Sequence, residues 1–209
     1  MLEPQYAAAG LGSIWDATLL EPMAELNAEV LEALAAAAAQ QSPAGATPAL
    51  QWQWRALGEA GRLRLARCPF LLVDAGFARA DYWCTPPGAA VHETVPAPAR
   101  PAQRGVLATP LLRRVLLFAW HLARANRVGA RVALGMSAAC AGAVAGWRFA
   151  DLEAVAELRP AWIRPRWENR PEVWRAWLSA ALQESPQGLE RLRLWGLQSL
   201  AAEVTAARA

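Results

Sequence analysis

Residues 109–126 read TPLLRRVLLFAWHLARAN and carry a clear helical pattern. Thr109 belongs to the residue types that cap helices, and Pro110 suits the first helical position, where its missing N–H would have no intrahelical partner. Apolar residues then recur at spacings of three and four, which places them on one helix face. We therefore expect an amphipathic helix from Thr109 to about Asn126. Its apolar stripe consists of Leu111, Leu112, Val115, Leu116, Ala119 and Leu122.

The residues that follow predict a succession of short helices with short connections. Gly135 suits a helix end in the left-handed conformation, and Ser137 offers its hydroxyl to the free amides of the next helix. Pro171 and Pro186 are placed to open two further helices near the C-terminus. An extended stretch at 162–170 separates the two groups. The expected helices span about 127–134, 137–146, 149–158, 171–183 and 185–206.

The first part of the chain predicts one long helix and one weaker one. Asp16 can cap a helix that runs to about Gln40, because its apolar residues again recur at spacings of three and four. Residues 49–67 fit a helix imperfectly, and Gly58 and Gly61 weaken it. The apolar positions of the long helix are Leu19, Leu20, Met23, Leu26, Val30, Leu31 and Leu34.

Proline and glycine divide the chain. Residues 41–48 predict a linker, and residues 85–105, rich in proline, predict an extended loop or an interdomain linker. The run 68–73 fits a buried strand or a short helix, and its periodicity does not distinguish the two. We therefore expect an acidic helical region at 1–84 and a basic helical domain at 106–209 that ends in two helices.

Composition favours an all-α fold. Alanine and leucine, which are strong helix formers, are abundant in the 209 residues, whereas Ile, Thr and Tyr are scarce. With 55% apolar residues the chain can bury a real core. We expect a multi-helix bundle of short and medium helices, with room for one small strand near 69–74.

Nothing in the sequence predicts a membrane span or a secretory leader. The longest uncharged apolar stretch surrounds Ala35–Ala39 and is too short and too weakly hydrophobic to cross a bilayer. The N-terminus lacks the basic and apolar regions of a secretory signal. We therefore expect a cytoplasmic protein without membrane insertion.

Catalytic and metal-binding signals are sparse. The strongest nucleophile or soft-metal candidates are Cys68, Cys84, Cys140, His92 and His121, and none has Cys-x-x-Cys or His-x-x-x-His spacing. A zinc site built from Cys84, His92 and distant cysteines is the alternative. We expect no enzymatic activity, no metal and no cofactor.

Eleven tryptophans are unusual for a chain of this length. Tryptophan dominates both cores and interfaces because its side chain buries a large area. The side chains therefore either fill the core among small alanines or anchor a protein partner. The candidate anchors are Trp162, Trp167, Trp174, Trp177 and Trp195.

Positive charge is concentrated in the middle of the chain. Residues 113–175 hold 11 Arg and 5 acidic residues, a net charge of +6, whereas residues 1–112 hold 7 Arg and 10 acidic residues, a net charge of −3. Phosphate binding needs such an excess. The alternative is that these arginines form ion pairs, with Glu157, Glu168 and Glu172 as acceptors. The candidate nucleic-acid-binding residues are Arg124, Arg127, Arg131, Arg148, Arg164, Arg166 and Arg170.

The same region resembles the FlhD-type flagellar transcriptional regulators over about 53 residues. The resemblance is carried by LLFAWHL at 116–122, LGMS at 134–137 and the Arg-Trp pair at 166–167, with further matches between them. It implies an α-helical homodimer that joins an unrelated zinc-binding partner protein to activate promoters. The further matches are Ala141, Ala145, Leu152, Ala156 and Glu157.

Two functions follow from these features. The first is a non-enzymatic transcriptional regulator or DNA-associated adaptor that acts through the basic, FlhD-like domain. The alternative is a protein-interaction or assembly component, for example of a secretion or flagellar system, that holds its partner with exposed tryptophans.

Overall fold

The computed structural model describes residues 17–40, 48–84, 109–159 and 162–206 and is an all-α bundle, as predicted, with one small two-stranded sheet. No single helix among these residues is long and apolar enough to cross a membrane. The helices are α2 (Ala17–Gln40), α3 (Pro48–Ala56), α4 (Glu59–Ala66), α5 (Ala80–Trp83), α6 (Thr109–Ala125), α7 (Arg127–Leu134), α8 (Ala138–Gly146), α9 (Phe149–Leu158), α10 (Pro171–Leu182) and α11 (Pro186–Ala206).

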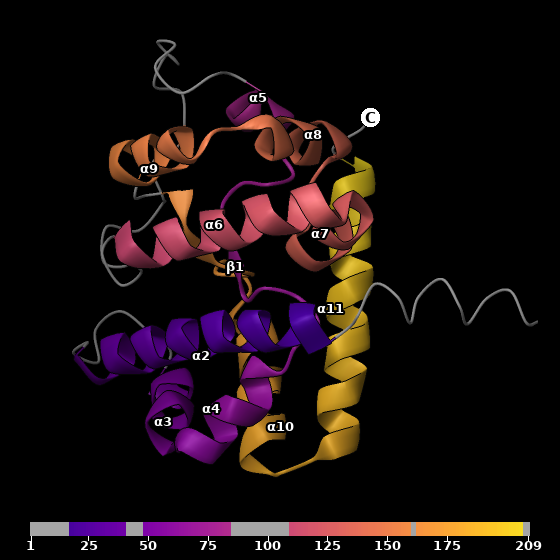
Figure 1. The fold of residues 1–209 in the computed structure, drawn as a ribbon. Coiled ribbons are helices and arrows are strands. Elements are labelled where there is room, and N and C mark those ends of the chain that lie inside the picture. Colours follow the sequence, from indigo (N-terminus) through magenta and orange to yellow (C-terminus); the bar gives the residue numbers. More distant parts are fainter. Residues whose placement is uncertain (1–16, 41–47, 85–108, 160–161, 207–209) are drawn as a thin grey trace, which may run out of the picture.

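Helix α6 lies in the middle of the bundle (Figure 1). Helix α2 packs along one side of it, in a layer with α3 and α4, and helices α8 and α9 pack on the other side. Helix α10 packs against α3 and α4, and α11 runs along one edge of the bundle to reach α7. Helix α6, the element with the clearest sequence pattern, therefore touches both layers.

The described parts on either side of the proline-rich region share one hydrophobic core. Val30 and Leu31 of α2, Leu112 and Leu116 of α6 and Leu178 of α10 are all buried in the same cluster of apolar side chains. The regions expected at 1–84 and 106–209 therefore do not form separate cores. The predicted linkers at 41–48 and 85–105 lie almost entirely outside the described residues.

The turn between α7 and α8 follows the predicted capping signals. Helix α7 ends at Gly135, whose φ of 69° is the left-handed conformation that glycine adopts most readily. The hydroxyl of Ser137 accepts a hydrogen bond from the Cys140 amide at 3.1 Å and caps α8. The side chain of Asn126, the last residue of the predicted long helix, caps α7 by accepting from the Gly129 amide.

The segment after α4 is neither a helix nor a full strand. The helix expected at 49–67 divides into α3 and α4, and the chain then passes through the centre of the bundle as an irregular buried segment, residues 68–73. Only Val73–Asp74, strand β1, forms sheet, pairing antiparallel with Arg164–Pro165, strand β2. The small strand expected near 69–74 is therefore present and very short.

A buried asparagine supplies the hydrogen bonds that this central segment cannot make for itself. The Asn27 Nδ2 of α2 donates to the carbonyl oxygens of Ala66 and Phe70, at 3.1 and 2.9 Å. Its Oδ1 accepts from the Leu72 amide at 2.8 Å. Because buried backbone polar groups must be paired, one side chain here satisfies three of them.

Replacing Asn27 with leucine is expected to lower the free energy of unfolding by about 3 kcal/mol or more, because three buried backbone groups lose their partner. Denaturant unfolding followed by circular dichroism measures the change. The matched control is Asn169→Leu, at an exposed position, which we expect to change the free energy by less than about 0.5 kcal/mol. Equal stability of the two variants would contradict this role of Asn27.

Candidate functional site

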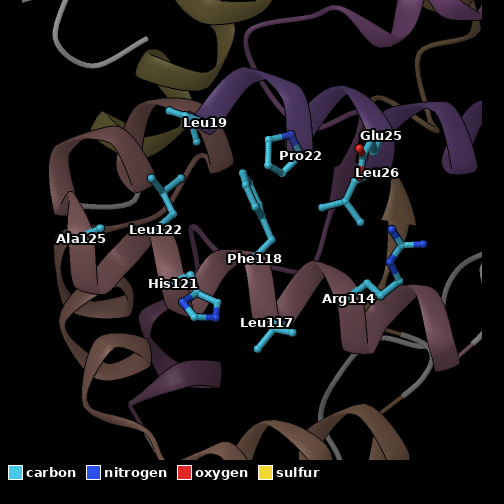
Figure 2. Close-up of a pocket in the computed structure, with 10 residues that line it drawn as sticks. All are labelled: Leu19, Pro22, Glu25, Leu26, Arg114, Leu117, Phe118, His121, Leu122 and Ala125. Atoms are coloured by element: carbon cyan, nitrogen blue, oxygen red, sulfur yellow. The ribbon is translucent and has the colours of Figure 1, made fainter. Parts of the chain in front are cut away.

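An open apolar groove lies between α2 and α6 and has a volume of about 450 Å³. The two helices run in opposite directions along it (Figure 2), with Leu19 beside Leu122 at one end and Leu26 near Arg114 at the other. The groove is lined by Leu19, Pro22, Glu25, Leu26, Arg114, Leu117, Phe118, His121, Leu122 and Ala125.

The groove has a buried floor and an exposed wall. The side chains of Leu19, Leu26 and Leu122 are buried and belong to the core or its edge. Phe118 projects from α6 toward Pro22 of α2 and is only partly covered, and Pro22 itself is exposed. Apolar area that the fold leaves open in this way is available to a partner.

The two ends of the groove differ in charge. At the Arg114 end, Glu25 lines the groove and the Arg114 guanidinium forms an ion pair with Glu29. At the other end His121 lines the groove, and Arg124 follows one turn from it on the same helix. The groove therefore ends beside a balanced ion pair on one side, and His121 is its polar lining residue toward the other.

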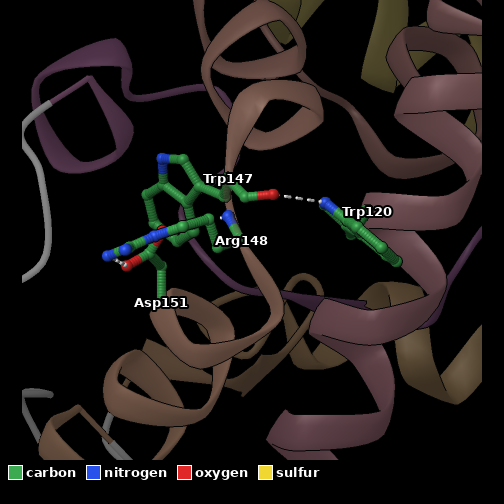
Figure 3. A network of polar contacts seen from close by, with 4 residues as sticks. All are labelled: Trp120, Trp147, Arg148 and Asp151. Atoms are coloured by element: carbon green, nitrogen blue, oxygen red, sulfur yellow. Dashed lines mark hydrogen bonds and ion pairs between the residues drawn. The ribbon is translucent and has the colours of Figure 1, made fainter.

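Arg148, one of the predicted nucleic-acid contacts, is paired with a carboxylate. Its guanidinium lies 3.0 Å from Asp151, whose carboxylate also accepts from the Arg148 amide at the start of α9 (Figure 3). These hydrogen bonds hold the pKa of Asp151 below its usual value. In the same network the Trp120 indole N–H donates to the Trp147 carbonyl. Arg148 is thus part of a helix cap.

Arg164 and Arg170 also have acidic partners. Arg164 lies 3.5 Å from Glu168, and Arg170 lies 3.1 Å from Glu172. The pKa of Glu172 is lowered by its own backbone amide and by the Arg170 side chain. Both pairs are the ion pairs that the sequence offered as the alternative to phosphate contact.

Arg166 lies in the interior, so its prediction as a nucleic-acid contact is wrong. The residue is 4% exposed, and its guanidinium donates to the carbonyl oxygens of Leu71 and Leu134, at 2.6 and 2.5 Å. Its backbone amide donates to the Leu72 carbonyl, and its own carbonyl accepts from the Trp174 indole. Burial lowers the pKa of Arg166 from its ordinary value. The side chain joins the central segment to the end of α7 and leaves no surface for phosphate.

Three of the predicted arginines remain without a carboxylate partner among the described residues, and we call them the basic corner: Arg124, Arg127 and Arg131. They lie on the last turn of α6 and on α7. Arg124 and Arg127 are exposed, and the Arg124 guanidinium lies 4.7 Å from the centre of the Trp120 ring. In the sequence Arg124 precedes Ala125, the last groove residue on α6, and Arg127 and Arg131 follow it; none of the three is among the residues that line the groove.

Three of the predicted tryptophan anchors are core residues, so their prediction as partner contacts is wrong. Trp177 is only 1% exposed, and Trp162 and Trp174 are also buried. The Trp174 ring packs against Trp54, and the Trp177 ring meets the edge of Phe70. These rings fill the space around the central segment, as expected for core aromatics.

Trp167 and Trp195 are half-buried and pack on each other, with ring centres 5.1 Å apart. Arg170 lies over the Trp195 ring. Among the described residues, the tryptophan with an exposed side chain is Trp52 of α3, at 65%, which the sequence analysis did not single out. In the sequence Trp52 lies between Gln51 and Gln53, whose side chains are buried. The polarity of these residues therefore did not predict that the tryptophan is the exposed one.

The buried cysteines are poor nucleophiles. Burial raises the pKa of Cys68 to about 12 and raises that of Cys140 as well, so both stay protonated at neutral pH. Cys84 is exposed. His92, the other residue of the alternative zinc site, lies outside the described residues. Within the described part of the chain, no three His, Cys, Asp or Glu side chains are grouped to hold a metal ion.

A second pocket, polar and about 300 Å³ in volume, lies where Arg166 approaches the surface. Asp74 and Glu203 line it and partly offset the effect of burial on the Arg166 pKa. Partial burial raises the pKa of Glu203. Arg164 and Arg170 line the same pocket but are already paired. The three arginines of the lining, Arg164, Arg166 and Arg170, therefore match its three carboxylates, Asp74, Glu168 and Glu203, in formal charge.

Comparisons with models of protein families, with curated proteins and with solved structures found no match for this chain.

Replacing Arg166 with methionine is expected to lower the free energy of unfolding by about 2–4 kcal/mol, because two buried carbonyl oxygens lose their donor. The same change at Arg164, whose side chain is half-exposed and paired on the surface, should cost less than about 1 kcal/mol. Guanidinium chloride unfolding of both variants measures the difference. If Arg164→Met were the more costly change, the structural role of Arg166 would be wrong.

Proposed function

We propose that this chain is a protein-docking module that holds a partner in the groove between α2 and α6. The single observation that carries the proposal is that groove, an apolar channel of about 450 Å³ that the described residues leave open. Binding grooves for helical partners have this construction, with apolar side chains from two helices forming the floor.

The pairing and burial of the predicted arginines favour protein docking over nucleic-acid binding. Of the seven arginines predicted to meet DNA, three have carboxylate partners and one is buried. A DNA-binding surface needs free positive groups to replace the counterions of many phosphates. The three arginines that lack a carboxylate partner among the described residues are few for such a surface.

We infer that the module acts by binding and not by catalysis. The thiols of Cys68 and Cys140 are buried and protonated. His121 lies exposed at the groove, and Glu25, toward the Arg114 end, is the only acid among the described residues that line it. The groove therefore lacks the adjacent nucleophile and base that acyl or phosphoryl transfer would need.

A second candidate is the DNA-associated regulator that the FlhD resemblance implies. The basic corner supports it, because its three arginines lack a carboxylate partner among the described residues. Its contacts would come from Arg124, Arg127 and Arg131, without the four other arginines that the sequence suggested. Such a small set predicts weak binding with a shallow dependence on salt.

Selection of random peptides displayed on phage against the folded chain tests the docking function. We expect the recovered peptides to bind the wild-type chain and to bind Phe118→Asp at least about tenfold more weakly. The aspartate removes the apolar contact that Phe118 makes with the peptide, and its carboxylate would have to lose its hydration shell when the peptide binds. The matched control is Trp52→Asp, which changes an exposed aromatic residue on α3 and should leave affinity within about twofold.

Recovered peptides that bind both variants equally would contradict docking at the groove. Fluorescence anisotropy with a labelled DNA duplex tests the second candidate at the same time. Binding at low salt that Arg127→Glu removes and Phe118→Asp preserves would favour the regulator over the docking module.

A further inference from the structure

The polar pocket beside Arg166 has the size of a small-molecule site. Its volume of about 300 Å³ is at the lower end of the range for ligand pockets in proteins. The pocket is formed by one continuous stretch, residues 164–170, together with Asp74 of β1 and Glu203 near the end of α11. Three parts of the chain that are distant in sequence therefore place charged side chains around one small volume.

Arg166 brings a buried positive charge to this pocket. Its guanidinium donates to the carbonyl oxygens of Leu71 and Leu134, which are neutral acceptors. The carboxylates of Asp74 and Glu203 attract the guanidinium from the pocket, but neither forms an ion pair with it. A buried cation is costly without a charged partner. The pocket therefore favours an anionic group placed against Arg166.

Asp74 and Glu203 are carboxylates without an ion-pair partner among the described residues. The Oδ1 of Asp74 accepts from two backbone amides of the turn that follows β1, at 2.9 and 3.3 Å. The Trp167 side chain offers a hydrogen bond to Glu203. Both carboxylates thus have neutral donors and remain available to a cation.

The other charges at the pocket are paired. Arg164 lies 3.5 Å from Glu168, and Arg170 lies 3.1 Å from Glu172. A ligand therefore meets one guanidinium and two carboxylates that are not yet paired. A phosphate ion would be repelled by the two carboxylates, and a simple cation would be repelled by Arg166. A molecule that carries one group of each sign can satisfy all three side chains.

Burial orders these three side chains by depth. Arg166 is 4% exposed, Asp74 is half-buried and Glu203 is exposed. The anionic group of a ligand therefore lies deep, and its cationic group lies nearer the mouth. The long backbone of a nucleic acid cannot reach Arg166, whereas a molecule of the size of the pocket can.

We propose that this pocket binds a free α-amino acid, a function separate from docking at the groove and independent of it. The carboxylate of the amino acid pairs with Arg166, and its ammonium group pairs with Asp74 and Glu203. Pro165 and Trp167, which also line the pocket, provide apolar contact for its side chain. An α-amino acid holds both charges within one small unit, which suits the volume.

Titrations of the full chain with the common protein amino acids, followed by saturation-transfer NMR, test this assignment. At least one amino acid should bind with a Kd of about 1 mM or tighter. Its N-acetyl derivative lacks the ammonium group, and its amide derivative lacks the carboxylate. Each derivative should bind at least about tenfold more weakly, because each leaves part of the pocket without its charge partner.

Two substitutions test the ammonium contact on the protein. Asp74→Asn removes the charge and keeps the Oδ1 acceptor of the turn, and Glu203→Gln removes the charge at the mouth. Each should weaken the amino acid at least about fivefold and should not weaken the N-acetyl derivative. The matched control is Glu190→Gln, at an exposed position on the same helix as Glu203, which should leave the affinity within about twofold.

The carboxylate contact is tested with Arg166→Gln. The folded variant, checked by circular dichroism and by its melting temperature, should lose amino-acid binding. Where the substitution prevents folding, the amide derivative tests the same contact on the wild-type chain, because it lacks the group that Arg166 would hold.

Four results would overturn the proposal. The first is no binding of any amino acid at about 10 mM. The second is an N-acetyl derivative or inorganic phosphate that binds as tightly as the amino acid, which would make the pocket an anion site. The third is an amide derivative that binds as tightly, which would make it a cation site. The fourth is binding that both Asp74→Asn and Glu203→Gln leave unchanged. None of these results affects docking at the groove, which the Phe118→Asp variant tests separately.

Discussion

The fold depends on a stretch of backbone that crosses the centre of the bundle and is irregular except for its last residue, Val73 of β1. Residues 68–73 are almost wholly buried, so their amides and carbonyls must find partners inside the protein. From α2, Asn27 makes two hydrogen bonds to this segment and a third to the Ala66 carbonyl at the end of α4, and Arg166 supplies its guanidinium and its backbone amide from the other side. The Leu71 amide donates to the end of α7. Helices distant in sequence are thereby fixed to one segment.

This constraint decides which residues are left for function. Arg166 and the tryptophans around it are buried and make contacts inside the protein. The region of residues 162–177, where the sequence places most candidate binding groups, is therefore largely structural. The neighbouring arginines are paired with acids. Among the described residues, the groove between α2 and α6 remains open. The groove exists because the central segment and the core hold α2 beside α6, while Phe118 is only partly covered and Pro22 is exposed.

The sequence predicted the helices and helix caps, which depend on neighbouring residues, but not the features that depend on contacts between residues far apart in the chain. The spacing of Leu112 and Leu116 predicted α6, and Gly135 and Ser137 predicted the turn between α7 and α8, because caps and stripes depend on near neighbours. The burial of Arg166 depends on carbonyl groups 95 and 32 residues away. The groove likewise depends on the register of α2 against α6, where paired residues are 85 positions apart. No local pattern records such separations.

Hydrogen–deuterium exchange at the central segment tests this account most directly. If the bonds from Asn27 and Arg166 hold the bundle together, the amides of Leu71, Leu72 and Arg166 will exchange only when the whole protein unfolds. Their opening free energy will then equal the global value from denaturant unfolding. Exchange of these three amides at a clearly lower free energy, while α6 and α10 stay protected, would show that the segment opens by itself and would contradict the account.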